Sequence, residues 1–173
     1  MKHIAETGRL ILREFINEDA QDFFDLNSDP DVLKFTGDEA FAKIEDAVIF
    51  LKNYQERQYR SLGYGRWAVI LKNTNQFIGW CGLKKNEEDL IDLGFRFYKD
   101  QWNKGYATEA AKATLTYGFH ELQLHEIIGR ATQENSASIR VLEKIGMKFW
   151  KHGNCKGILN SSYYKITKSG FNL

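Results

Sequence analysis

The chain has 173 residues, of which 43% are hydrophobic, and this is enough for one domain with a complete core. That content rules out a wholly disordered protein, and the formal net charge of +1 argues against a strongly basic nucleic-acid binder. Residues 1–6 lack the apolar segment of a secretory signal, and no apolar run approaches the ~20 residues that cross a bilayer. We therefore expect a single domain over residues 1–173, located in the cytoplasm, that contacts neither membranes nor nucleic acids directly.

The first part of the chain predicts a strand and two helices. Residues 8–15 form a short strand, and Asp19 caps a helix that ends before Pro30, because the residue before a proline avoids the helical region. Residues 34–42 are expected to be irregular. A longer helix follows, and its apolar residues share one side; these are Ala47, Val48, Leu51 and Tyr54.

The middle of the chain predicts an antiparallel meander. Three strand-like segments, 64–71, 77–83 and 91–98, are joined by short polar turns, and such short connections favour hairpins. Gly79 and Gly82 lie inside the second of these strands. Glycine inside a strand indicates a bulge or the close approach of another backbone.

The last part of the chain changes the pattern. Residues 105–122 have helical periodicity and precede a strand at 127–132, so a helical crossover joins this strand to 91–98 and makes the two strands parallel. The remaining elements are a helix at 135–145 and two short strands at 149–150 and 162–167. The expected fold is a mixed α/β sheet, mostly antiparallel, of about seven strands flanked by about four helices.

Two segments in this part carry chemistry. Residues 101–110 follow a strand and open a helix, where backbone N–H groups have no intrahelical partner and the helix dipole adds positive potential. Gly105 permits a tight turn there, which suits a phosphate or pyrophosphate; the alternative is an ordinary strand-to-helix turn. The glycine patterns of dinucleotide and nucleoside-triphosphate loops are missing. The second segment, 135–147, follows the parallel strand, so Asn135 and Ser138 lie at the same sheet edge.

Together these segments resemble the acyl-CoA-binding motifs of the GNAT superfamily of N-acetyltransferases. The run at 102–110, Trp-Asn-Lys-Gly-Tyr-Ala-Thr-Glu-Ala, is most similar to the branch that contains ribosomal-protein N-terminal (alanine or serine) acetyltransferases. Other segments that fit are 9–13, 78–79, 92–95 and 143–147. The resemblance covers about residues 7–167, and its motifs are specific to the superfamily rather than to a substrate.

The resemblance implies an acetyltransferase that uses acetyl-CoA as co-substrate, without a metal, and acetylates a primary amine. We expect direct attack in a ternary complex, because the sequence places no plausible acyl-accepting nucleophile near the cofactor segments. The acceptor is a protein N-terminus or a small molecule, and the enzyme is a monomer or a homodimer. The strands 91–98 and 127–132 are expected to splay apart and admit the pantetheine arm. The residues implied in cofactor binding are Arg96, Phe97, Asn103, Lys104, Gly105, Tyr106, Ala107, Thr108, Asn135 and Ser138. The alternative is an acyl-CoA-binding sensor or pseudoenzyme without turnover.

Asp92 is the first candidate for the catalytic base, because an amine must lose a proton before it attacks. Burial within the strand would raise the pKa of its carboxyl. The family often has Glu here, and the shorter Asp favours a water relay; the alternative is a hydrogen-bonded or solvated carboxylate. Many members protonate the leaving thiolate with a Tyr that this chain lacks, so Ser138 or Ser136 is the candidate donor, or else a serine of the helix cap.

The acceptor site has weaker signals. Phe35 and Trp67 either form its wall or belong to the core, and Asp38 or Glu39 either attracts a cationic amine or is solvated. We predict no metal site, since the spacing of five between His120 and His125 places the two rings on different sides of a helix. Cys81 is expected to be a core thiol, and Glu109 to have a structural role. These last two expectations are independent of the acceptor's identity.

Overall fold

The computed structural model contains one eight-stranded sheet in the order β1-β2-β3-β4-β5-β6-β8-β7. It describes residues 2–155 and 158–171. The strands are β1 (His3–Glu6), β2 (Leu10–Arg13), β3 (Arg66–Leu71), β4 (Phe77–Lys85), β5 (Ile91–Phe97), β6 (Glu126–Thr132), β7 (Lys148–Cys155) and β8 (Ile158–Thr167). The helices are α1 (Ala20–Leu26), α2 (Pro30–Leu33), α3 (Ile44–Tyr54), α4 (Tyr106–His120) and α5 (Ser136–Lys144). This confirms the mixed, mostly antiparallel α/β fold.

Two elements differ from the sequence-based expectation. The strand β1 is added at the edge of the sheet, where it pairs with β2. Pro30 does not merely end α1; it opens the short helix α2, because Asp29 accepts a hydrogen bond from the Asp31 N–H at 2.8 Å and caps it. Proline fits the first turn of a helix, where its missing N–H is not needed.

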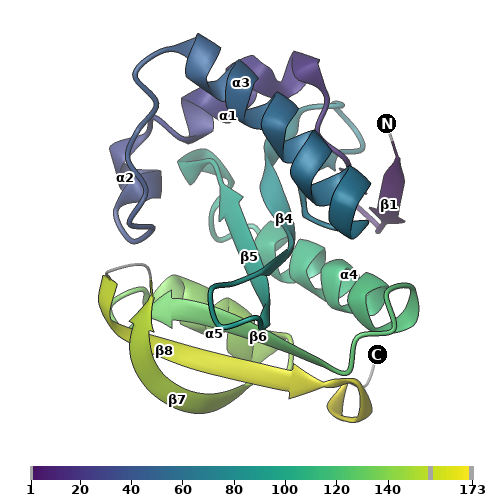
Figure 1. Cartoon of the computed structure of the whole chain (residues 1–173), viewed down its shortest axis with the longest axis vertical. Helices are drawn as coiled ribbons and strands as arrows, with labels where there is room; N and C mark the ends of the chain where they lie inside the picture. Colours follow the sequence, from purple (N-terminus) through teal and green to yellow (C-terminus); the bar gives the residue numbers. More distant parts are fainter. Residues whose placement is uncertain (1, 156–157, 172–173) are drawn as a thin grey trace.

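The helices cover the two faces of the sheet unequally. Figure 1 shows α1, α2 and α3 together on one side of β4 and β5, and α4 on the other side. The core between the first group and the sheet contains Phe23 and Leu51 from the helices and Ala68, Ile70 and Trp80 from the strands. The larger core under α4 and α5 takes the alternate residues of the same strands, so β3 and β4 are buried on both faces. Within the described residues, no helix is both long and apolar enough for a membrane span.

The central strands approach each other closely at the two predicted glycines. A Cβ on Gly79, whose φ is +150°, would lie 2.2 Å from the Arg96 carbonyl oxygen. A Cβ on Gly82 would lie 2.3 Å from the carbonyl oxygen of Gly65. The register also shifts between Val69 and Ile70, opposite the first glycine. The expected close approach and irregularity are therefore both present, and only glycine fits at these two positions.

The parallel pair β5–β6 is short. Its register pairs are Asp92 with Ile128 and Leu93 with Gly129, and no pair follows them toward the carboxyl ends in the described chain. Figure 1 shows β5 continuing toward α1 and α2 while β6 runs away beneath it. The two strands therefore separate beyond Leu93, as the resemblance implied, and the loop before α4 and the start of α5 follow their separated ends.

Candidate active site

The loop before α4 has the backbone of an anion-binding turn. Asn103 and Gly105 both adopt left-handed conformations, with φ of 60° and 82°, and the helix begins at the next residue. No described side chain caps this N-terminus, so the first N–H groups of α4 remain available as donors. The first helical bond runs from the Glu109 N–H to the Gly105 oxygen at 3.0 Å. A 15-residue helix adds its dipole to these donors, which suits a phosphate group.

Residues of the turn between β1 and β2 hold this loop and the first turn of α4 in place. The carboxylate of Glu109 accepts hydrogen bonds from the Thr7 hydroxyl at 2.6 Å, the Arg9 N–H at 3.0 Å and the Arg9 Nε at 2.7 Å. Arg9 Nη1 donates to the Lys104 carbonyl at 3.0 Å. Partial burial alone would raise the pKa of Glu109, but the hydrogen bonds from Thr7 and Arg9 lower it below its ordinary value. Glu109 thus has the structural role expected, and Arg9 is a partner that sequence reasoning missed.

We expect Glu109→Gln to weaken acetyl-CoA binding about tenfold, which corresponds to ~1.4 kcal/mol. The neutral amide keeps the shape of the side chain but loses the charge-assisted hydrogen bonds that hold the Arg9 side chain against the loop. Titration calorimetry with acetyl-CoA measures the change. Glu121→Gln, at an exposed glutamate just after the same helix, is the matched control and should bind as the wild type does. Equal affinities for the two variants would show that the hydrogen bonds of Glu109 do not hold the loop in the conformation that binds acetyl-CoA.

Asn135 and Ser138 lie at the start of α5, on the other side of the gap between β5 and β6. The Asn135 Oδ1 accepts a hydrogen bond from the Ser138 N–H at 3.1 Å and caps the helix. The side-chain Nδ2 of Asn135 and the hydroxyl of Ser138 take no part in that bond. Capping therefore fixes the Asn135 side chain in place and leaves its amide N–H₂ as a donor.

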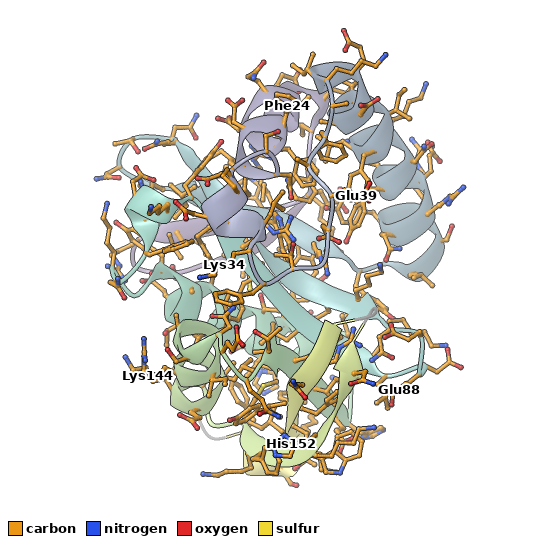
Figure 2. The ribbon with its side chains drawn as sticks, turned by 90° about the vertical axis from the view of Figure 1, so that its left-hand side faces the viewer. Phe24, Lys34, Glu39, Glu88, Lys144 and His152 are labelled. Carbon is orange, nitrogen blue, oxygen red and sulfur yellow. The ribbon has the colours of Figure 1, made fainter. Side chains whose placement is uncertain are left out.

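Arg96 and Phe97 form the free end of β5 beside this gap. Both pair with β4, at Trp80 and Gly79, while β6 has already separated from β5. The Phe97 carbonyl accepts a hydrogen bond from the Trp102 Nε1 at 2.9 Å, and no β6 residue pairs with this end of β5, so its β6 side is open to a ligand. The Arg96 side chain is buried and points elsewhere: it donates to Asn27 and, at 2.6 Å, to Asp38. Asp38 is thus paired with Arg96, which ties the 34–42 segment to β5. In Figure 2 this segment, with Lys34 and Glu39, lies between the N-terminal helices and the elements that carry Lys144 and His152.

Asp92 lies at the point where β5 and β6 part. Its Oδ2 accepts hydrogen bonds from the Arg130 Nε at 3.1 Å and Nη2 at 2.8 Å, and Arg130 also pairs with Glu87 at 2.8 Å. The Oδ1 atom is buried without a hydrogen-bond partner in the described chain. Burial raises the pKa of the Asp92 carboxyl above its ordinary value, although the charge of Arg130 acts in the opposite direction. One oxygen is therefore anchored and the other remains available to accept a proton.

The sequence compares well with a known family over most of its length. The family described as acetyltransferase (GNAT) domain matches residues 9–148. This chain belongs to the GNAT acetyltransferase family. It is 37% identical to the uncharacterized N-acetyltransferase YnaD of Bacillus subtilis over 98% of this chain and 99% of that protein.

Solved structures support the fold of this GNAT acetyltransferase. A GNAT-family acetyltransferase from Bacillus anthracis is 33% identical, with a TM-score of 0.82 over 97% of this chain and 99% of that one. A spermidine N-acetyltransferase from Vibrio cholerae, solved with CoA and spermine, has a TM-score of 0.79 over 95% of this chain and 98% of that one at 19% identity. The second likeness concerns the fold alone. The superfamily inferred from the sequence is thereby confirmed.

Trp67 and Phe35, the two residues expected at the acceptor site of this GNAT enzyme, differ in how deeply they are buried. Trp67 is fully buried in the core under α4, with its ring 5.2 Å from that of Tyr117, so it belongs to the core rather than to an open wall. Phe35 is half-buried beneath the Lys34 ammonium group, which lies 5.1 Å from its ring centroid.

Cys81 is fully buried against the Thr114 hydroxyl, and burial raises the pKa of its thiol to about 12. It is the core thiol that the sequence predicted.

Metal ligands do not gather in the described part of this GNAT chain: residues 2–155 and 158–171 contain no group of three or more His, Cys, Asp or Glu side chains placed to hold an ion. The residues of the two cofactor segments offer backbone N–H groups and an asparagine amide, which suit phosphates and amides rather than metals. The donors present therefore fit the pantetheine and diphosphate parts of a CoA thioester.

Proposed function

We propose that this protein transfers the acetyl group of acetyl-CoA to a primary amine by direct attack in a ternary complex. The observation that carries the proposal is the separation of β5 from β6 directly beside the uncapped N-terminus of α4. Acetyl-CoA supplies a thioester carbonyl carbon that an amine can attack. Cys81 supports direct transfer, because a fully buried thiol with a raised pKa is a poor acceptor for an acetyl group.

The cofactor-binding roles follow from which groups have no partner on β6 or in a helix. Backbone groups of Arg96 and Phe97 on the β6 side would pair with the amides of the pantetheine arm, the Phe97 carbonyl in addition to the Trp102 Nε1. The Nδ2 of Asn135 would donate to the same arm, with Ser138 beside it. The backbone N–H groups of the loop before α4 and of its first turn would hold the diphosphate; these residues are Asn103, Lys104, Gly105, Tyr106, Ala107 and Thr108.

In the proposed reaction Asp92 removes the proton that the acceptor ammonium must lose. Its Oδ1 is the accepting atom, through a water molecule, while Arg130 holds Oδ2 in place. The amine nitrogen then bonds to the acetyl carbon, the carbon–sulfur bond breaks, and the sulfur takes a proton. Ser138 remains the candidate donor of that proton. One proton is released to solvent overall, since an ammonium and a thioester give an amide and a thiol.

Thermal unfolding with a panel of ligands tests the cofactor. We expect acetyl-CoA and CoA, at 100 times their Kd, to stabilise the fold by about 2.7 kcal/mol, and ATP and NAD to have no such effect. Release of free thiol from acetyl-CoA should require an added amine. Stabilisation by ATP or NAD alone would contradict the proposed function.

A second candidate function is an acyl-CoA-binding sensor without turnover. The ion pair that Arg130 makes with Asp92 favours it, because a carboxylate held in this way can be purely structural. Binding of acetyl-CoA without thiol release in the presence of any amine would identify this alternative. The narrower similarity to ribosomal-protein N-terminal acetyltransferases, the cytoplasmic location and the monomeric or dimeric state stay predictions from the sequence.

A further inference from the structure

One face of the central sheet gathers charged side chains beside the proposed reaction centre. Arg66 of β3 is in register with Gly82 of β4 and Gly94 of β5, so these three residues face the same side. Asp92 and Arg96 flank Gly94 on that side, because alternate residues of a strand share a face. The face opposite α4 therefore carries the proposed base and two arginines, with Arg66 at the level of Gly94, between Asp92 and Arg96.

The Arg66 side chain reaches across β4 to β5. A Cβ placed on Gly94 would lie 3.5 Å from Nη2 and 3.6 Å from Nε of Arg66. The guanidinium group also lies 4.2 Å from the centre of the Trp80 ring. Two glycines thus leave the space that this guanidinium occupies, and it lies over the middle of the proposed cofactor strand.

The backbone of Arg66 is fixed from both sides by tyrosine hydroxyls. The Tyr54 hydroxyl accepts from the Arg66 N–H at 2.6 Å, and the Tyr59 hydroxyl donates to the Arg66 carbonyl. Tyr54 ends α3, and Tyr59 lies in the π-helical segment Gln55–Arg60 that continues it, a type of turn frequent at functional sites. The hydroxyls of Tyr54 and Tyr59 therefore hold the start of β3 against α3 and the π-helical segment that follows it.

Among the described residues Arg66 differs from its charged neighbours in forming no ion pair, although its positive charge acts to lower the pKa of Asp92. Arg130 pairs with Asp92 at 2.8 Å, and Arg96 pairs with Asp38 at 2.6 Å. In the part of the chain that the structure describes, the Nε of Arg66 is buried and has no hydrogen-bond partner. A buried donor without a partner is costly unless a ligand supplies the acceptor. An oxygen anion is the ligand that a guanidinium binds best.

We propose that the acceptor of this enzyme is an amine that also carries an oxyanion, either a carboxylate or a phosphate, and that Arg66 binds that group. This inference rests on the proposed function and adds the class of substrate. The oxyanion takes no part in the bond changes; it orients the amine toward the Asp92 side of β5. A polyamine is disfavoured, because its second ammonium group would meet the Arg66 guanidinium.

Matched acceptors measure this preference in an assay of thiol release from acetyl-CoA. The set contains β-alanine, its amide, 1,3-diaminopropane and O-phosphoethanolamine, together with longer ω-amino acids, their amides and the corresponding diamines. For the wild type we expect kcat/KM of an anionic acceptor to exceed that of the matching amide and diamine by about tenfold or more. Comparison of the carboxylate and phosphate members shows which oxyanion is bound.

Variants assign the preference to Arg66. Arg66→Gln should reduce the ratio of kcat/KM for the acid to kcat/KM for the amide to about one, and Arg66→Lys should keep part of this preference. The control is Arg57→Gln, at an exposed arginine of the π-helical segment Gln55–Arg60, which should leave the preference unchanged. The melting temperature of each unliganded variant shows whether it folds. An equal or greater rate with amides and diamines, or a preference that survives in Arg66→Gln, would overturn the inference.

A binding measurement separates this inference from the proposed function. The anionic amines, but not their amides, should raise the melting temperature of the wild type and Arg57→Gln in the presence of excess CoA, and should fail to do so in Arg66→Gln. If acetyl-CoA neither binds nor turns over, the proposed function is wrong, while this stabilisation still decides whether Arg66 binds an oxyanion. Its absence in the wild type would overturn the inference even if amides are acetylated.

Discussion

Replacing Asp92 by Asn should lower kcat for acetyl transfer by about 100- to 10,000-fold and leave the Kd for acetyl-CoA unchanged. The amide cannot accept the proton that the ammonium loses, and Asp92 lies at the start of the gap between β5 and β6 rather than in the diphosphate loop. Steady-state kinetics with a saturating amine gives kcat, and calorimetry gives the Kd. A variant with full activity would remove Asp92 from the proposed mechanism.

A matched control separates the base from the ion pair. Glu87→Gln removes a different carboxylate partner of Arg130, at 2.8 Å, from a side chain that is about half exposed. We expect its kcat to stay within a few-fold of the wild type, because exposed ion pairs contribute little. Equal losses in the two variants would show that Arg130 positioning, and not proton transfer, determines the rate.

The pH dependence follows from the direction of the Asp92 pKa shift. Burial raises the pKa of this carboxyl above 3.8, so the basic form is lost, and kcat/KM falls, at a higher pH than for an exposed Asp. The sign for stability is opposite: the contribution of this group is fully present below its ordinary pKa and is lost as pH rises through the raised value. Asp92→Asn should remove both effects from a pH–rate profile and from unfolding at a series of pH values.

Gly79→Ala should destabilise the fold by roughly 3 kcal/mol and also weaken acetyl-CoA binding. The new methyl group would lie 2.2 Å from the Arg96 carbonyl oxygen and 2.8 Å from the Phe97 Cα, which are backbone atoms of β5 and cannot rotate away. Relief of the clash must move the strand end that we propose pairs with pantetheine. Urea unfolding followed by circular dichroism gives the change in unfolding free energy.

The control for this variant is Gly8→Ala. No atom lies within 4 Å of the Cβ that this substitution adds, so we expect the unfolding free energy to change by less than ~0.5 kcal/mol. A Gly79→Ala variant as stable as Gly8→Ala would show that β4 and β5 can move apart without cost, and would contradict a rigid cofactor strand.

Local sequence patterns predicted the elements, and the loop before α4, because their causes are local. Periodicity, a cap residue and a glycine that permits a left-handed turn all act within a few positions of one another. Pro30 was misread because proline both ends one helix and begins the next, and the cap by Asp29 decides between the two. Trp67 stayed ambiguous because β3 is buried on both faces, and alternation along the strand then does not separate core from site.

The contacts that position the site could not be read from such patterns. Glu109 contacts Thr7 and Arg9, which are 102 and 100 residues earlier in the chain. Arg66 lies against Gly94 only because the register of β3, β4 and β5 aligns the two residues. Register depends on turn geometry and on which face is buried, and a shift by one residue would turn Arg66 into the α4 core. Local patterns therefore predicted the turn before α4 and the cap of α5, whereas the long-range contacts of Glu109 and Arg66 required the sheet register.

The short pairing of β5 with β6 has a consequence for how the molecule holds together. Two register pairs join the first five strands to the last three, so the sheet is nearly interrupted at its centre. In the proposed complex the pantetheine arm fills that interruption and continues the hydrogen bonding from β5. The ligand then acts as a structural element, and the loaded enzyme has a continuous sheet that the chain alone does not complete.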